Sequence, residues 1–198
     1  MNLLSALPSR QGHFLLESGY HADTWLDLGG LFVDQQTVAR LVRALADRLR
    51  RHDVDAVCGP LLGGAFLAQA LAHTLGRAFY YTEPSIRVLG SGLFKAQYRL
   101  PAELRTRIQG AKVAVVDDAI SAGSPVRATI AELEDAGATT VVVGTFLLMG
   151  DTGANHFAEQ GLTVEALDRR RFTMWKPDEC PLCREGTPLE STSESHSG

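Results

Sequence analysis

Cysteine and long apolar runs are both scarce in this sequence. It has 3 cysteines in 198 residues, an odd and sparse count that argues against a disulfide framework and for a reducing cytoplasm. No apolar run approaches the roughly 20 residues of a membrane-spanning helix. Residues 1–8 lack the basic start and long apolar centre of a secretory signal. We therefore expect a cytoplasmic protein with no membrane partner.

Positive charge is scarce as well. The formal net charge is -4, with 19 Lys and Arg against 23 Asp and Glu. A general nucleic-acid binder normally carries a basic face, so we expect no nucleic-acid partner. Phosphate substrates are not excluded, because backbone amides, a few arginines and a bound cation can hold them. The hydrophobic share of 45% and the length suit one globular domain.

Strand-like and helix-like segments alternate along the chain. After a short helix and turn over residues 1–12, apolar positions at helical spacing predict a helix within 35–52, capped by Asp34. Gly76 is expected to close a second helix. Two short strands are expected within 13–28, around a turn at Ser18 and Gly19, and residues 86–89 and 93–100 could form a hairpin. Further strands are expected at 54–58, 78–82, 112–117, 139–148 and 162–167. This alternation predicts an α/β fold, a mainly parallel sheet flanked by helices. Ligands of such sheets bind at the carboxyl ends of the strands.

The stretch 113–124, VAVVDDAISAGS, is the most informative part of the sequence. Its apolar run ends in Asp117 and Asp118, and Pro125 fits the first turn of a following helix. Free amides at a helix N-terminus bind anions, and two adjacent carboxylates could hold sugar hydroxyls or a metal ion. Solvated acids that cap a turn are the alternative. The small residues that follow favour a ligand site, because a ligand can approach their backbone closely.

This stretch resembles the ribose-5-phosphate motif of type I phosphoribosyltransferases. The resemblance implies that Asp117 and Asp118 hold ribose hydroxyls and that residues 121–124 hold the 5-phosphate of 5-phosphoribosyl-1-pyrophosphate (PRPP). It also implies that the glycine-rich turn after Cys58 lies under the pyrophosphate, although that turn alone is a weak signal and lacks the ending of a P-loop. The implied PRPP-binding residues are Asp117, Asp118, Ala119, Ile120, Ser121, Ala122, Gly123, Ser124, Pro60, Leu61, Leu62 and Gly63.

Pro125 departs from the family pattern, which usually has a hydroxyl residue there. Proline offers neither a hydroxyl nor a backbone donor, so phosphate affinity is expected to be weaker.

Segments near both ends of the sequence resemble one subfamily of the phosphoribosyltransferases. Residues 12–28 look like the start of orotate phosphoribosyltransferases, with a Phe-x-Leu-x-Ser-Gly segment, and residues 175–189 resemble the C-terminus of a bacterial subgroup. The resemblance implies pyrimidine biosynthesis, a homodimer, and Mg²⁺ held by Asp117 and Asp118 mostly through ligand or water. The expected organisation is one domain, 1–189, with a small hood from 1–30 and 162–189, a core at 31–161, and a disordered tail at 190–198.

Two regions depart from the orotate enzymes. Those enzymes carry a loop rich in Arg and Lys that closes over pyrophosphate, whereas residues 81–99 contain only Arg87, Lys95 and Arg99 as cations. A leaving pyrophosphate needs positive charge, so these three are the catalytic candidates beside the acid pair, with solvated surface charges as the alternative. Orotate enzymes also place an Arg, as partner of the orotate carboxylate, where residues 148–151 have none.

The activity predicted is therefore phosphoribosyl transfer between PRPP and an orotate-type nitrogenous base, giving a nucleoside 5′-monophosphate and pyrophosphate. A pentosyltransferase that uses another base is one alternative. A protein that binds PRPP or a nucleotide without turnover is a second.

The pair Cys180 and Cys183 could supply two zinc thiolates, and a tetrahedral site needs two more ligands. No spacing points to His156 or His196 as those ligands. We therefore expect a buried structural or dimer-contact role for the pair, with a zinc-holding interaction module as the alternative.

Overall fold

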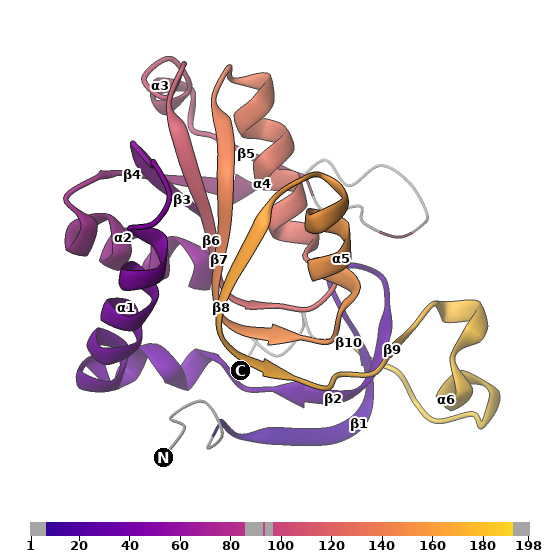
Figure 1. The fold of residues 1–198 in the computed structure, drawn as a ribbon. Coiled ribbons are helices and arrows are strands. Elements are labelled where there is room, and N and C mark those ends of the chain that lie inside the picture. Colours follow the sequence, from indigo (N-terminus) through magenta and orange to yellow (C-terminus); the bar gives the residue numbers. More distant parts are fainter. Residues whose placement is uncertain (1–6, 86–92, 94–96, 192–198) are drawn as a thin grey trace.

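The computed structural model describes residues 7–85, 93 and 97–191. Within those residues the strands form two sheets, a core sheet in the order β5-β4-β3-β6-β7-β8 and a hood sheet in the order β10-β1-β2-β9 (Figure 1). The core strands are β3 (Ala56–Pro60), β4 (Ala78–Pro84), β5 (Tyr98–Arg99), β6 (Lys112–Ile120), β7 (Thr139–Met149) and β8 (Thr163–Arg170). The hood strands are β1 (Ser9–Leu15), β2 (His21–Leu26), β9 (Met174–Trp175) and β10 (Glu190–Ser191).

Helices cover both faces of the core sheet (Figure 1). One face carries α1 (Gln35–Leu49) and α2 (Gly63–Leu75), and the other carries α4 (Ser124–Asp135) and α5 (Thr152–Glu159). Side chains of β6 alternate between the two faces, as the period of a strand requires. Ala114 and Val116 pack with α1 and α2, whereas Val113 and Val115 pack with α4. The short helical elements are η2 (Gly29–Val33), α3 (Ala102–Arg105), η3 (Pro177–Glu179) and α6 (Pro181–Arg184).

The predicted helix signals are confirmed. The Asp34 carboxylate accepts hydrogen bonds from the backbone N–H groups of Gln36 and Thr37 at the start of α1. Gly76 ends α2 in the left-handed conformation, with φ 64°. Every helix in the described ranges falls short of the length and apolar character needed to cross a bilayer.

The order of the core strands reverses between β3 and β6. From β3 the chain adds β4 on one side and later adds β6, β7 and β8 on the other, and all of these pairings are parallel. A crevice forms at the carboxyl ends of strands at such a reversal, and ligands of open α/β sheets bind there. The turns that follow β3 and β6 therefore meet at the predicted edge.

Four boundaries differ from the sequence prediction. Strand β1 begins at Ser9, where a helix and turn were expected. Strand β8 pairs with β7 in the core sheet, so residues 163–170 do not belong to the hood sheet. Glu190 and Ser191 pair with β1 instead of starting a disordered tail, and residues 192–198 lie outside the described part. Strand β6 runs on to Ile120, because its ladder with β7 continues past the two acids.

Candidate functional site

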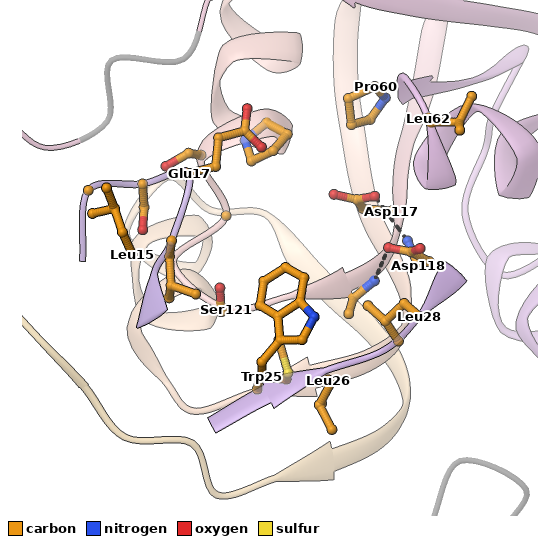
Figure 2. Close-up of a pocket in the computed structure, with 18 of the residues that line it drawn as sticks. Leu15, Glu17, Trp25, Leu26, Leu28, Pro60, Leu62, Asp117, Asp118 and Ser121 are labelled. Carbon is orange, nitrogen blue, oxygen red and sulfur yellow. Dashed lines mark hydrogen bonds between the residues drawn. The ribbon is translucent and has the colours of Figure 1, made fainter. Parts of the chain in front are cut away.

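A cavity of about 1620 Å³ lies between the hood and the carboxyl ends of the core strands. The hood contributes the β1–β2 turn and residues 24–29, and the core contributes the turns after β3 and β6. Figure 2 shows the acid pair between the turn that carries Pro60 and Leu62 and the hood strand that carries Trp25. The cavity therefore forms at the reversal of strand order.

Asp117 and Asp118 lie near the carboxyl end of β6, where this strand still pairs with β7, and both are partly buried. The backbone N–H of Asp118 donates to Oδ1 of Asp117 at 3.0 Å, and the N–H of Ala119 donates to Oδ1 of Asp118 at 2.7 Å. Each carboxylate is thus oriented by the residue that follows it. The strand holds two acids side by side at the cavity wall.

The surroundings of the pair oppose its ionisation. Burial, and then the charge of Asp118, raise the pKa of Asp117 well above its ordinary value, and Glu17 adds to that repulsion. Burial also raises the pKa of Asp118. Glu17 comes from the hood turn and accepts a hydrogen bond of 2.9 Å from the hydroxyl of Tyr98 on β5. A cation or a set of hydroxyl donors would relieve this repulsion.

The acid pair fits Mg²⁺ by its chemistry, because Mg²⁺ prefers carboxylate oxygens and keeps several other oxygen ligands. Among the described residues, no third acid, His or Cys gathers with these two carboxylates. A bound Mg²⁺ would therefore need substrate or water oxygens to complete its coordination, as the resemblance implies.

The turn after β3 packs directly on the acid pair. A Cβ on Gly63 would lie 2.2 Å from Oδ2 of Asp118, and one on Gly64 would lie 2.9 Å from Oδ1 of Asp117. A Cβ on Gly59 would meet the Gly64 carbonyl oxygen at 2.1 Å, and the Leu61–Leu62 peptide is cis. These glycines let the two turns approach more closely than any residue with a side chain would allow.

The turn after β6 leads into the N-terminus of α4. Gly123 precedes that helix with φ 76°, a conformation that glycine adopts at little cost. The hydroxyl of Ser124 is buried and has no hydrogen-bond partner among the described residues. A buried hydroxyl without a partner is costly, so it points to a ligand that is bound in the working protein. The position suits an anion.

Most of the residues implied for PRPP line the cavity, while a few lie just behind it. Ile120 and Ala122 are buried beneath the turn and are not in the lining, and Gly63 faces Asp118. The implied residues that line the cavity are Asp117, Asp118, Ala119, Ser121, Gly123, Ser124, Pro60, Leu61 and Leu62.

Of the three candidate cations, the structure describes Arg99 alone. The guanidinium of Arg99 donates to Oε2 of buried Glu132 on α4 at 2.6 Å, and Arg99 is not in the lining. Arg87 and Lys95 lie outside the described residues. Of the lining residues that the structure describes, Arg10 is the only cation. Arg10 was missed by the sequence prediction because residues 1–12 were expected to form a helix and turn instead of a strand.

Apolar residues also line the cavity. Trp25 of the hood points toward the acid pair (Figure 2), and Leu26, Leu28, Met149 at the end of β7 and Phe172 are in the lining as well. An apolar lining that includes an indole ring suits an aromatic base. Residues 148–151, where the resemblance places the Arg that pairs with the orotate carboxylate, contain no Arg, and Met149 of this stretch lines the cavity.

Comparison with known proteins places these features in a family. The sequence-family model of the phosphoribosyl transferase domain matches residues 32–165 of this chain. This chain belongs to the phosphoribosyltransferase family. Orotate phosphoribosyltransferase of Caldanaerobacter subterraneus subsp. tengcongensis is 31% identical, over 90% of this chain and 87% of that protein. The enzyme of the same name from Thermotoga maritima is 30% identical, over 91% of this chain and 89% of that protein.

Solved structures show the same fold for this phosphoribosyltransferase. Orotate phosphoribosyltransferase from Aeropyrum pernix aligns with a TM-score of 0.61 and 23% identity, over 81% of this chain and 87% of that one. Adenine phosphoribosyltransferase from Thermoanaerobacter pseudethanolicus aligns with a TM-score of 0.67 and 16% identity, over 85% and 98%. The predicted family resemblance, the α/β fold and the pentosyltransferase class are confirmed.

Proposed function

We propose that this phosphoribosyltransferase joins orotate to the ribose of PRPP and releases pyrophosphate. The observation that carries the proposal is the arrangement of one cavity, in which the Asp117–Asp118 pair lies between the glycine turn after β3 and the anion site at α4. The names of the relatives that are about 30% identical over most of the chain support orotate as the base.

The roles follow from the positions. Asp117 and Asp118 hold the ribose 2- and 3-hydroxyls and stabilise positive charge that develops on the ribose ring. Residues 121–124 hold the 5-phosphate, and the turn from Pro60 to Gly63 faces the pyrophosphate. A base nitrogen then forms a bond to C1 of the ribose while the C1–O bond breaks, pyrophosphate leaves with that electron pair, and the proton of the base nitrogen passes to solvent. Positioning and electrostatics supply the rate, without a covalent intermediate.

The charge of the cavity supports a role for Mg²⁺. Within the described residues the lining acids are Glu17, Asp27, Asp117 and Asp118, against Arg10 alone as a cation. Mg²⁺ would be held by Asp117 and Asp118 through ligand or water, and when bound it would neutralise charge on the pyrophosphate and ribose oxygens. Arg87 and Lys95 remain the proposed catalytic cations. We assign Arg99 a positioning role, because its ion pair with Glu132 ties β5 to α4.

A second base remains a candidate because of one observation. Met149 and Phe172 line the apolar end of the cavity, and residues 148–151 contain no Arg to pair with a carboxylate. A base without a carboxylate is therefore the second candidate.

The deciding experiment measures pyrophosphate release from PRPP and Mg²⁺ with orotate, uracil and adenine in parallel. Release with orotate supports the proposal, and release only with uracil or adenine moves the substrate while keeping the reaction. Asp47→Asn, on the exposed face of α1, serves as a control that should match the wild type, whereas Asp117→Asn should lose activity. PRPP binding with no release for any base would contradict catalysis.

The proposal includes a homodimer in the cytoplasm. Val33, Leu62 and Phe66 are 81%, 62% and 46% exposed. The Phe66 ring lies 5.6 Å from that of Phe32, and Leu62, which lines the cavity, lies four residues before Phe66 at the start of α2. Phe32, Leu62 and Phe66 therefore form one apolar patch next to the cavity, and the exposed Val33 follows Phe32 in the chain. Exposed patches of this kind mark protein interfaces. The free thiols of Cys58, Cys180 and Cys183 support a reducing compartment.

A further inference from the structure

Four side chains of the types that ligate metal ions converge on one point of the hood. All four are far from the acid pair in the sequence. His13 lies on β1, His21 begins β2, and Cys180 and Cys183 flank the start of α6. One donor atom from each lies within 4.8 Å of the donor atoms of all the others. We propose that His13, His21, Cys180 and Cys183 form a structural zinc site.

The distances suit tetrahedral coordination. Zn–N bonds of about 2.0–2.1 Å and Zn–S bonds of about 2.3 Å place neighbouring donor atoms of a tetrahedral site roughly 3.3–3.8 Å apart. Here Nε2 of His13 lies 3.4 Å from Sγ of Cys180 and 3.6 Å from Sγ of Cys183. Nδ1 of His21 lies 3.2 Å from Sγ of Cys183 and 3.0 Å from Nε2 of His13, both slightly shorter than that range. Two thiolates and two imidazoles in this arrangement select zinc.

The second nitrogen of His13 prepares the ring for metal binding. Nδ1 lies 2.8 Å from the carbonyl oxygen of Thr187, and a carbonyl only accepts, so Nδ1–H is the donor. Nε2 therefore carries the lone pair and points it at His21, Cys180 and Cys183. This is the outer-shell hydrogen bond that fixes the tautomer of metal-binding histidines.

Hydrogen bonding alone leaves this cluster poorly satisfied. The single lone pair of His13 Nε2 accepts one hydrogen, yet three polar atoms lie within 3.6 Å of it. His13, His21 and Cys180 are 1%, 5% and 0% exposed, so water replaces few of the missing partners. A metal ion uses all four lone pairs at once.

Local backbone structure brings these ligands together. The β1–β2 ladder shifts register between Gln11 and Phe14, which marks a bulge. Because of it, the neighbouring residues His13 and Phe14 are both buried, although successive side chains of a regular strand face opposite sides. The site thereby ties α6 to both long strands of the hood, and a site with four protein ligands is closed and structural instead of catalytic.

The test is the metal content of the full chain, purified without a histidine tag after growth with zinc chloride. We expect about one zinc per chain in the wild type. The Cys183→Ser and His21→Gln variants should fall at least about tenfold below that, because each removes one ligand. Cys58→Ala, in the core sheet, and His73→Gln, on the exposed surface of α2, should keep their zinc.

Two measurements on the wild type keep the proposal testable if the variants fail to fold. Cobalt(II) chloride added to chelated protein should give the visible absorption of a tetrahedral thiolate site, and chelation should lower Tm. Zinc far below one per chain after loading, or a Cys180–Cys183 disulfide found by mass spectrometry, would overturn the site. The assay needs neither PRPP nor a base, so its result is independent of the proposed activity.

Discussion

When the two acids of β6 are ionised, their buried charges oppose the stability of the fold. The folded-state pKa of Asp117 lies well above its ordinary 3.8, because of burial and the neighbouring Asp118. Between the two pKa values the folded chain binds more protons than the unfolded chain, so stability falls as pH rises through that interval. The ligand-free protein should therefore lose stability as the pair ionises, and Mg²⁺ with PRPP should restore it.

We expect Asp117→Asn to raise the Tm of the ligand-free protein at neutral pH, because it removes a charge that the folded state opposes. The gain should be on the order of 1 kcal/mol. It should shrink as pH falls towards the ordinary pKa of Asp, where the wild-type pair is protonated. The same variant should lose the thermal protection that PRPP with Mg²⁺ gives the wild type.

Scanning calorimetry across pH, with and without PRPP and Mg²⁺, measures both effects, and Asp47→Asn is the matched control on an exposed ion pair. Unchanged protection by PRPP in Asp117→Asn would contradict the ribose-binding role.

At the scale of elements, the shape of the candidate site depends on the contact between the turn after β3 and strand β6. The turn between β3 and α2 packs so closely on β6 that a Cβ on Gly63 would overlap Asp118. The contact joins segments more than 50 residues apart, so the two turns form one continuous surface of the cavity. Their sequence spacing alone shows neither this contact nor its distance.

We expect Gly63→Ala to displace the Asp118 carboxylate and to weaken PRPP binding at least about tenfold, since small errors in position carry a large cost. Titration calorimetry with PRPP and Mg²⁺ measures the loss. The control is Gly30→Ala, where a Cβ would meet no atom within 4 Å. Equal affinities for the two variants would show that the turn does not position the acid pair.

Signals within an element were readable from the sequence, and those that depend on a partner element were not. The Asp34 cap and the Gly76 terminus are local and were predicted. The extension of β6 to Ile120 depends on its ladder with the long strand β7. Strands β9 and β10 have two residues each, too few to show a period.

In the candidate site, too, features that depend on a partner element could not be predicted from the sequence. The acid pair and its turns carry a local pattern, and they line the cavity as implied. The partner of Arg99 on α4 and the histidines beside Cys180 are brought close only by tertiary folding. The sequence therefore did not indicate which histidines would complete a zinc site with the two cysteines, because His13 precedes Cys180 by 167 residues.

At the scale of the molecule, the exposed apolar patch at Leu62 and Phe66 predicts the oligomeric state. We expect light scattering to give twice the chain mass for the wild type, and the mass of one chain for Phe66→Lys, because a charge there must be desolvated at an interface. Leu189→Lys, at an apolar residue that is 44% exposed in the C-terminal segment, is the control. A wild type that is monomeric at every concentration tested would contradict the proposed dimer.

The hood sheet joins residues near both ends of the described chain, since β10 pairs with β1 and β9 pairs with β2. During synthesis on the ribosome, β1 and β2 emerge first, and the whole core sheet follows before either of their partners exists. Domains commonly fold as they emerge, so a nascent chain can complete the core with its acid pair still open to water. Pro177 and Ser191, which line the cavity, arrive only after the core strands, so we expect the cavity to close later than the core folds.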